Sequence, residues 1–295
     1  DHLDLHSFPT RRSSDLAAES YSDAINQVVV TYLDYTQNVL IANSEGKFVE
    51  DERTRTRYII NSVAQRDGKM QHGSIGKGSG KGFELYDEID VTWIGKESAR
   101  IATTMLDAKA SPSGKFPVVL DNKFGGVIFH EACGHGLEAT SVAKGNSVFA
   151  DKLGQKIASE VVSAVDDGTI SNEWGSANYD DEGTPTRRNL LIDKGILKGF
   201  MIDKLNARRM NMDITGSSRR QSYKYAPTSR MTNTYILGGT SKFDDMIDSI
   251  EYGLYAKYLG GGSVNPATGE FNFATQEAYL IENGKITTPD RKSVV

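Results

Sequence analysis

The pattern of hydrophobic and polar positions in the first part of the chain predicts an antiparallel meander. Asn26–Tyr32 is rich in β-branched residues, and a second apolar segment, Asn38–Asn43, leads into the turn Ser44–Gly46. Arg and Thr then alternate from Arg53 to Arg57 before the apolar segment Tyr58–Ala64. Such alternation is typical of a strand with one face in solvent.

A helix is predicted from Ile94 to Ala110, where apolar residues recur at helical spacing and Ser111–Gly114 supplies the stop. We place a boundary there, between an N-terminal domain (residues 17–112) and a second domain (residues 113–289). Gly73–Gly82 holds five glycines but lacks the Gly-Lys-Ser/Thr frame of a phosphate loop, and no apolar strand leads into it. It is interpreted as a flexible hairpin tip or linker.

The second half of the chain is predicted to be mostly β. Asn189–Met201 has the pattern of a strand, a glycine turn and a returning strand. Further strands are expected at Phe116–Leu120, Met231–Leu237, Tyr255–Leu259, Glu270–Thr275 and Ala278–Ile286, and short helices at Leu205–Met210 and Phe243–Glu251. The predicted class is therefore α+β with two domains: an N-terminal α/β domain with antiparallel strands, and a β-rich C-terminal domain that carries the candidate chemistry.

Composition excludes some classes of function. The net charge of −5, from 34 basic and 39 acidic residues, does not suit a nucleic-acid-binding surface. No apolar run approaches the roughly 18 residues that a membrane helix needs. Cys133 is the single cysteine of the chain, so no intrachain disulfide can form, which favours an intracellular location.

The two ends differ in pattern from the segments beside them. Residues 1–16 and 290–295 resemble translations of sequencing-adapter DNA, and we expect both to be non-native. The chain is then a fragment of a longer protein, and both ends are left out of the fold prediction.

The candidate chemistry lies in His130-Glu131-Ala132-Cys133-Gly134-His135. Two histidines with a glutamate beside the first are typical of a metal site whose water is deprotonated by the carboxylate. The histidines are five residues apart, so a regular helix would point them about 140° apart. The helix must therefore be distorted, and a π-type bulge near Gly134 would align them. The alternative is a helix with two partly buried histidines satisfied by backbone groups.

A third ligand is not fixed by this motif. Cys133 shares a helical face with His130, although a small buried thiol is the simpler interpretation. Glu138 lies one turn beyond His135 and could equally form a salt bridge or a cap. His72 is predicted to be solvent-exposed.

The segment Gly126–Glu138 resembles the TldD/PmbA family of metallopeptidases, in particular its TldD-like, metal-carrying member. The similarity extends to Asp181–Thr186, Arg219–Tyr223, Pro227–Thr234 and Gly260–Phe271. It implies a cytoplasmic, zinc-dependent enzyme that cuts unfolded or leader peptides and pairs with a PmbA/TldE-like subunit. It also implies that His130 and His135 bind the metal, that Glu131 is the catalytic base, and that a third ligand, a cysteine, lies beyond the end of this chain.

Two further segments are candidates for substrate binding. Gly261, Gly262 and Val264 could let a peptide backbone approach closely, although a long glycine turn explains them equally well. Arg219, Arg220 and Tyr223 could contact the peptide, or form a structural ion-pair cluster. The competing functions are a non-catalytic peptide-binding or assembly subunit, which would need neither the histidines nor Glu131, and a nucleotide-binding enzyme that uses Gly73–Gly82.

Overall fold

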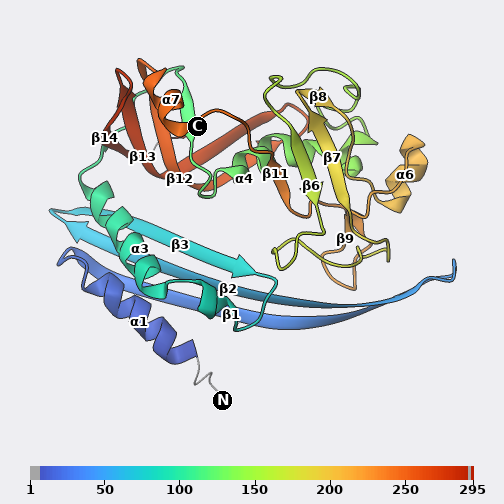
Figure 1. The fold of residues 1–295 in the computed structure, drawn as a ribbon, viewed down its shortest axis with the longest axis horizontal. Coiled ribbons are helices and arrows are strands. Elements are labelled where there is room, and N and C mark those ends of the chain that lie inside the picture. Colours follow the sequence, from blue (N-terminus) through green and yellow to red (C-terminus); the bar gives the residue numbers. More distant parts are fainter. Residues whose placement is uncertain (1–6, 292–293) are drawn as a thin grey trace.

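The computed structural model describes residues 7–291 and 294–295, and its first part is a three-stranded antiparallel sheet in the order β1-β2-β3 (Figure 1). The strands are β1 (Ile25–Ala42), β2 (Phe48–Arg66) and β3 (Lys69–Ser79). The predicted meander is confirmed. The two strand segments predicted before the turn form one continuous strand, because the residues between them pair with Arg53–Arg57 of β2. The result is a long two-stranded ribbon that extends well beyond β3.

Helices α1 (Ser7–Glu19) and α3 (Val91–Leu106) cover one face of this sheet, and the short α2 (Leu85–Glu88) precedes α3 (Figure 1). The predicted helix is confirmed; it begins after Asp90, whose side chain accepts a hydrogen bond from the Trp93 backbone N–H at 2.9 Å. Its buried face packs with Tyr58 and Ile60 of β2 in one core.

Part of the N-terminal segment left out of the fold prediction belongs to this core. Residues 7–16 lie in α1, where Ser14 is fully buried and forms a hydrogen bond with the Tyr58 hydroxyl. Residues 1–6 lie outside the described residues. The foreign origin of this segment stays a prediction.

The prediction of a flexible tip or linker at Gly73–Gly82 is wrong for most of that segment. Gly73, Gly76 and Gly78 lie within β3, and α3 packs directly on the strand. A Cβ on Gly73 would overlap the backbone oxygen of Ser98, whose hydroxyl donates to the Gly73 carbonyl at 2.9 Å. The glycines serve a close helix–strand approach, which hydrophobic patterning does not reveal.

The second part of the chain contains two larger sheets. The five-stranded sheet has the order β4-β14-β13-β12-β5, in which β5 is parallel to β12 and β4 is parallel to β14. Its strands are β4 (Lys109–Ala110), β5 (Val118–Leu120), β12 (Tyr252–Asn265), β13 (Glu270–Glu282) and β14 (Lys285–Arg291). The glycine-rich segment after Leu259, for which a long turn was one of two interpretations, is an irregular continuation of β12.

A four-stranded sheet with the order β11-β6-β7-β8 completes the second part, together with a two-stranded pair and three short helices. These elements are β6 (Ala164–Asp167), β7 (Arg188–Asp193), β8 (Ile196–Leu197), β9 (Ser218–Arg219), β10 (Thr228–Ser229), β11 (Thr234–Ile236), α5 (Ala139–Val142), α6 (Lys204–Met210) and α7 (Phe243–Asp248). The predicted strand–turn–strand at Asn189–Met201 is confirmed as β7 and β8.

Part of the C-terminal segment expected to be foreign also packs within the fold. Asp290 is buried in β14, where it pairs with Lys109 of β4 and accepts a hydrogen bond from the Ser111 hydroxyl at 3.1 Å. Residues 292–293 lie outside the described residues, and the origin of the segment is untested.

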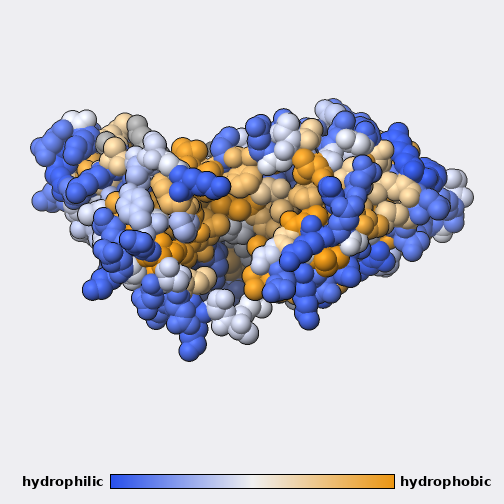
Figure 2. All heavy atoms as spheres, turned by 90° about the horizontal axis from the view of Figure 1, so that it is seen from above, coloured by the Kyte–Doolittle hydropathy of each residue, from blue (hydrophilic) through white to orange (hydrophobic). Residues whose placement is uncertain are grey.

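The chain is thus an α+β protein of two parts, as predicted. Seen from above, apolar residues gather along the hollowed middle of the molecule and hydrophilic residues cover both ends (Figure 2). No helix in the described part of the chain combines the length and apolar character needed to cross a membrane.

Candidate metal centre and adjoining cavity

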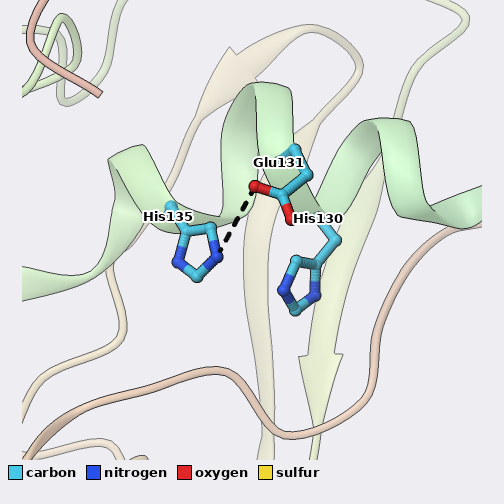
Figure 3. Close-up of side chains that lie close together, drawn as sticks. All are labelled: His130, Glu131 and His135. Atoms are coloured by element: carbon cyan, nitrogen blue, oxygen red, sulfur yellow. Dashed lines mark ion pairs between the residues drawn. The ribbon is translucent and has the colours of Figure 1, made fainter. Parts of the chain in front are cut away.

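The histidine motif lies on a helix that changes type along its length. It begins as α4 (Gly126–Phe129), continues as the π-helical η1 (His130–Gly134) and ends as the 3-10 turn η2 (His135–Leu137). The His135 backbone N–H donates to the His130 carbonyl, the five-residue hydrogen bond that defines a π-turn. The predicted distortion is confirmed. It brings the two imidazoles to the same side of the helix, with ring centroids 4.8 Å apart (Figure 3).

Packing on both sides holds this irregular helix in place. Val127 and Ile128 contact the core of the five-stranded sheet, whereas Phe129 and Leu137 belong to the core beneath the four-stranded sheet. At Gly134 a Cβ would overlap the Met231 sulfur. The backbone of Gly134 is ordinary right-handed helix, so its conformation does not call for glycine. The glycine instead serves the close packing of Met231 against the π-turn.

Glu131 completes a group of three side chains that could hold a metal ion. One ligand atom from each of His130, Glu131 and His135 lies within 4.8 Å of the others. The Glu131 carboxylate is 3.8 Å from His135 Nε2, as Figure 3 shows. Burial, and then the proximity of His135, lower the pKa of His130, which favours the neutral imidazole that binds metals. Two imidazoles with a carboxylate beside them are a set of side chains that could hold a divalent metal ion and its water.

Glu138 fixes the orientation of one imidazole. Its Oε2 lies 3.2 Å from His135 Nδ1, which leaves His135 Nε2 on the side of Glu131. Its other oxygen, Oε1, is 3.7 Å from Arg230 Nε. Glu138 was considered as a third ligand, a salt-bridge partner or a cap. In the structure its carboxylate contacts Nδ1 of His135, a position from which carboxylates commonly support metal-binding histidines.

Cys133 lies apart from the three ligand atoms. Its side chain packs against the core that contains Phe129 and Leu137. Burial raises the pKa of the Cys133 thiol to about 11, in keeping with a thiol enclosed by apolar side chains. His72 is exposed on β3, as predicted.

A cavity of about 410 Å³ adjoins the histidine-bearing helix, residues 126–137, at His130. It lies between the β1–β2 ribbon and the second part of the chain. Its lining comprises Tyr35, Gln37, Arg53, Arg55, His130, Trp174, Gly175, Ala177, Tyr179, Asp180, Asp181, Thr186, Gly216, Ser217, Ser218, Arg219, Arg230, Met231 and Thr232. Its volume lies in the range of small-molecule and peptide sites.

Buried polar contacts hold the ribbon against the second part. Arg53 donates to Asp51 at 3.1 Å, to Asp181 at 2.8 Å and to the Tyr179 carbonyl at 2.7 Å. Lys47 near the turn donates to the Gly183 carbonyl at 2.7 Å. The side of β2 predicted to face solvent therefore faces the rest of the protein, and it forms one wall of the cavity.

The substrate-binding candidates are divided between this cavity and other places. Arg219 lines the cavity. Arg220 is outside the lining; its backbone N–H donates to the Asp181 carboxylate at 2.8 Å and its guanidinium donates to the Tyr225 carbonyl at 3.3 Å. Tyr223 is 83% exposed on the surface. Gly261, Gly262 and Val264 lie on β12, also outside the lining.

Sequence reasoning missed Arg55, Trp174 and Arg230, which all line the cavity. The Arg/Thr alternation on β2 was the one available signal, and it was interpreted as a solvent-facing surface. Trp174 and Arg230 stand in loop segments without periodicity. Arg230 lies within the family-like segment Pro227–Thr234, but it was not singled out there.

Comparison with known protein families gives two matches. The central domain of PmbA/TldA metallopeptidases matches residues 11–106, and the C-terminal domain of the same family matches residues 113–295.

Curated relatives carry metalloprotease names. The chain is 42% identical to a metalloprotease TldD homolog of Buchnera aphidicola, covering 99% of this chain and 63% of that protein. It is 44% identical to the TldD homolog of Haemophilus influenzae, covering 93% and 58%. It is 38% identical to a metalloprotease of Methanocaldococcus jannaschii, covering 90% and 58%. The chain thus spans roughly three fifths of the length of these relatives.

Solved structures share the fold. A Thermotoga maritima protein superposes with a TM-score of 0.85 at 23% identity, covering 98% of this chain and 65% of that one. TldE from Thermococcus kodakarensis gives a TM-score of 0.79 at 22% identity, covering 94% and 62%. With both domain matches in order and identities above 40% across nearly the whole chain, this protein belongs to the TldD/PmbA family of metallopeptidases.

Proposed function

We propose that this chain carries the metal-binding core of a zinc-dependent peptidase of the TldD type. The observation that carries the proposal is the π-turn, which places His130 and His135 on one side of the helix with the Glu131 carboxylate beside them. A helix that only buried two histidines would not need this distortion. The third protein ligand is proposed to be a cysteine beyond this chain.

The roles of the residues follow from their positions. His130 and His135 would hold the zinc ion, which when bound polarises a peptide carbonyl and makes water more acidic. Glu131 accepts the proton of the attacking water and returns it to the leaving amine, as its place next to the ligand nitrogens allows. Glu138 keeps His135 in the orientation that presents Nε2.

The proposal extends to the substrate and the assembly. Unfolded or leader peptides are the proposed substrates, because the cavity beside His130 is lined by side chains from strands and loops that an extended peptide could contact. A PmbA/TldE-like subunit is the proposed partner, and the cytoplasm the proposed location. These three proposals are supported by the chain's membership of the TldD/PmbA family.

The Glu131→Gln variant of the full-length protein, co-expressed with its partner, tests the central step. Peptide cleavage should fall by about 10²–10⁴-fold while bound zinc, measured by metal analysis, is unchanged. Glu160→Gln, an exposed residue away from the site, is the matched control for the lost charge.

Unchanged cleavage by Glu131→Gln would remove Glu131 as the base. Absence of zinc from the unmodified full-length pair would instead favour the alternative, a non-catalytic peptide-binding or assembly subunit.

A further inference from the structure

Two arginines that line the cavity lack a carboxylate partner. Within the described residues, no carboxylate lies within 4.0 Å of the guanidinium of Arg55 or of Arg219. Arg55 donates to the Ser176 carbonyl at 2.6 Å and Arg219 donates to the Met231 carbonyl at 3.2 Å. Backbone carbonyls fix the positions of these side chains without neutralising their charge.

The other charged groups of the cavity are already engaged. Arg53 is bonded to Asp51 and Asp181, and Arg230 lies beside Glu138. The Asp180 carboxylate accepts backbone N–H groups of Glu182 and Thr184 at 2.9 and 2.8 Å. The acids in the lining therefore make their direct contacts with groups other than Arg55 and Arg219.

The protein lowers the pKa of both arginines. Burial is the main cause in each case, and neighbouring arginines add to it: Arg53 and Arg219 act on Arg55, and Arg230 acts on Arg219. Carboxylates at longer range act in the opposite direction, Asp51 on Arg55, and Glu138, Asp181 and Asp166 on Arg219. Arg55 and Arg219 thus lie within electrostatic reach of each other. A ligand carboxylate in direct contact with both guanidiniums would offset the burial cost and mutual repulsion that these more distant acids leave.

Arg219 lies close to the histidine-bearing helix, residues 126–137. Arg219 is bonded to the backbone of Met231, and the Met231 side chain fills the space beside Gly134 of the π-turn. His130 and Arg219 line the same cavity, whose wall also contains the ring of Trp174. A peptide bound in this cavity next to His130 could therefore contact both guanidiniums.

We propose that Arg55 and Arg219 form a carboxylate-binding subsite beside the metal centre. Its ligand is a carboxylate of the peptide, either the free C-terminus or an acidic side chain. Arginine suits this task because its planar fork can bind a carboxylate through two hydrogen bonds. The assignment of a peptide as ligand rests on the proposed function, whereas the preference for a carboxylate rests on two cavity guanidiniums that have no carboxylate in direct contact.

Binding of labelled peptides to the full-length Glu131→Gln protein tests the subsite without cleavage. Four versions of one peptide are compared by fluorescence anisotropy: the C-terminus is free or amidated, and one internal residue is Glu or Gln. Removing the recognised carboxylate should weaken binding roughly 10- to 100-fold. Loss on amidation identifies the C-terminus as the ligand, and loss on the Glu to Gln exchange identifies a side chain.

Variants then assign the preference to the two arginines. Arg219→Gln and Arg55→Gln should each reduce or abolish the difference between charged and neutral peptides, and Arg219→Lys should retain part of it. Arg66→Gln, on the same strand as Arg55 but in an exposed ion pair with Asp107, should leave the difference intact.

Equal affinity for all four peptides would overturn the subsite, and so would a preference that survives both glutamine variants. The peptide comparison on the unmodified arginines decides the matter even if a variant fails to fold. Carboxylate-dependent binding by a protein without zinc or cleavage would sustain the subsite and refute the peptidase. Cleavage without carboxylate preference would do the reverse.

Discussion

Replacing Glu138 with Gln should weaken zinc binding without unfolding the protein. The Glu138 carboxylate lies 3.2 Å from His135 Nδ1 and is the group that keeps His135 Nε2 directed toward Glu131. Glutamine has nearly the same volume but no charge, so it supports the imidazole less strongly. Changes to carboxylates behind metal-binding histidines commonly cost 10- to 100-fold in metal affinity, or about 1.4–2.7 kcal/mol.

The effect on folding should be small by comparison. Arg230, the other neighbour of Glu138, is 3.7 Å away and its side chain is 40% exposed, so solvent screens the charge that the substitution leaves unpaired. The steric environment of Glu138, which is 6% exposed, is preserved by glutamine. Zinc affinity and unfolding temperature should therefore separate, with the larger change in zinc affinity.

Competition against a fluorescent zinc chelator, at fixed pH and ionic strength, measures this on the full-length protein. Glu160→Gln is again the control for net charge, and Glu138→Asp keeps the charge but shortens its reach. If Glu138→Gln binds zinc as tightly as Glu160→Gln, then Glu138 does not orient His135 in the metal-bound protein and the reasoning fails.

Three further predictions concern stability. Gly73→Ala should lower the free energy of unfolding in urea by about 1–3 kcal/mol, because its Cβ overlaps the Ser98 backbone. Gly76→Ala should have much less effect, because the nearest atom to its Cβ would be the Ile59 Cγ1, 3.6 Å away. Asp203→Ala should lower the free energy of unfolding by about 3 kcal/mol at pH 7, because Asp203 caps α6 and accepts four hydrogen bonds. These hydrogen bonds lower the Asp203 pKa, so the loss should shrink as pH falls through the folded-state pKa. A loss that is constant with pH would contradict this. Burial raises the Asp166 pKa from 3.8 to about 6, so the contribution of Asp166 to the free energy of unfolding is greatest below pH 3.8, and about 3 kcal/mol of it should be lost as pH rises to 6. Asp166→Asn should flatten the plot of the free energy of unfolding against pH across that window. A slope unchanged by the substitution would show that Asp166 titrates normally.

Features encoded within a short stretch of chain could be predicted from the sequence. The Ser44–Gly46 turn between β1 and β2 and the glycine turn at Gly195 follow from local turn chemistry. The π-turn was also predictable, because the five-residue separation of His130 and His135 is compatible with one metal ion only if the helix is distorted.

Features that depend on distant contacts could not be predicted in this way. The glycines of β3 have the composition of a linker, and only the packing of α3 on the strand explains them. The same holds for Gly134, whose neighbour Met231 is almost 100 positions away in the chain. A single sequence shows that a glycine is present, but it does not show which atom occupies the space that its missing side chain leaves.

The cavity is the clearest case, because neither part of the chain forms it alone. Arg55 comes from the β1–β2 ribbon, whereas His130 and Arg219 come from the second part. The salt bridges of Arg53 to Asp51 and Asp181 join the two parts at this place. A guanidinium on an isolated ribbon would be solvated and indifferent to ligand charge, so its role arises when the second part removes water from it. The candidate metal ligands can therefore be recognised within six residues, while the groups that would select a substrate become apparent only in the assembled fold.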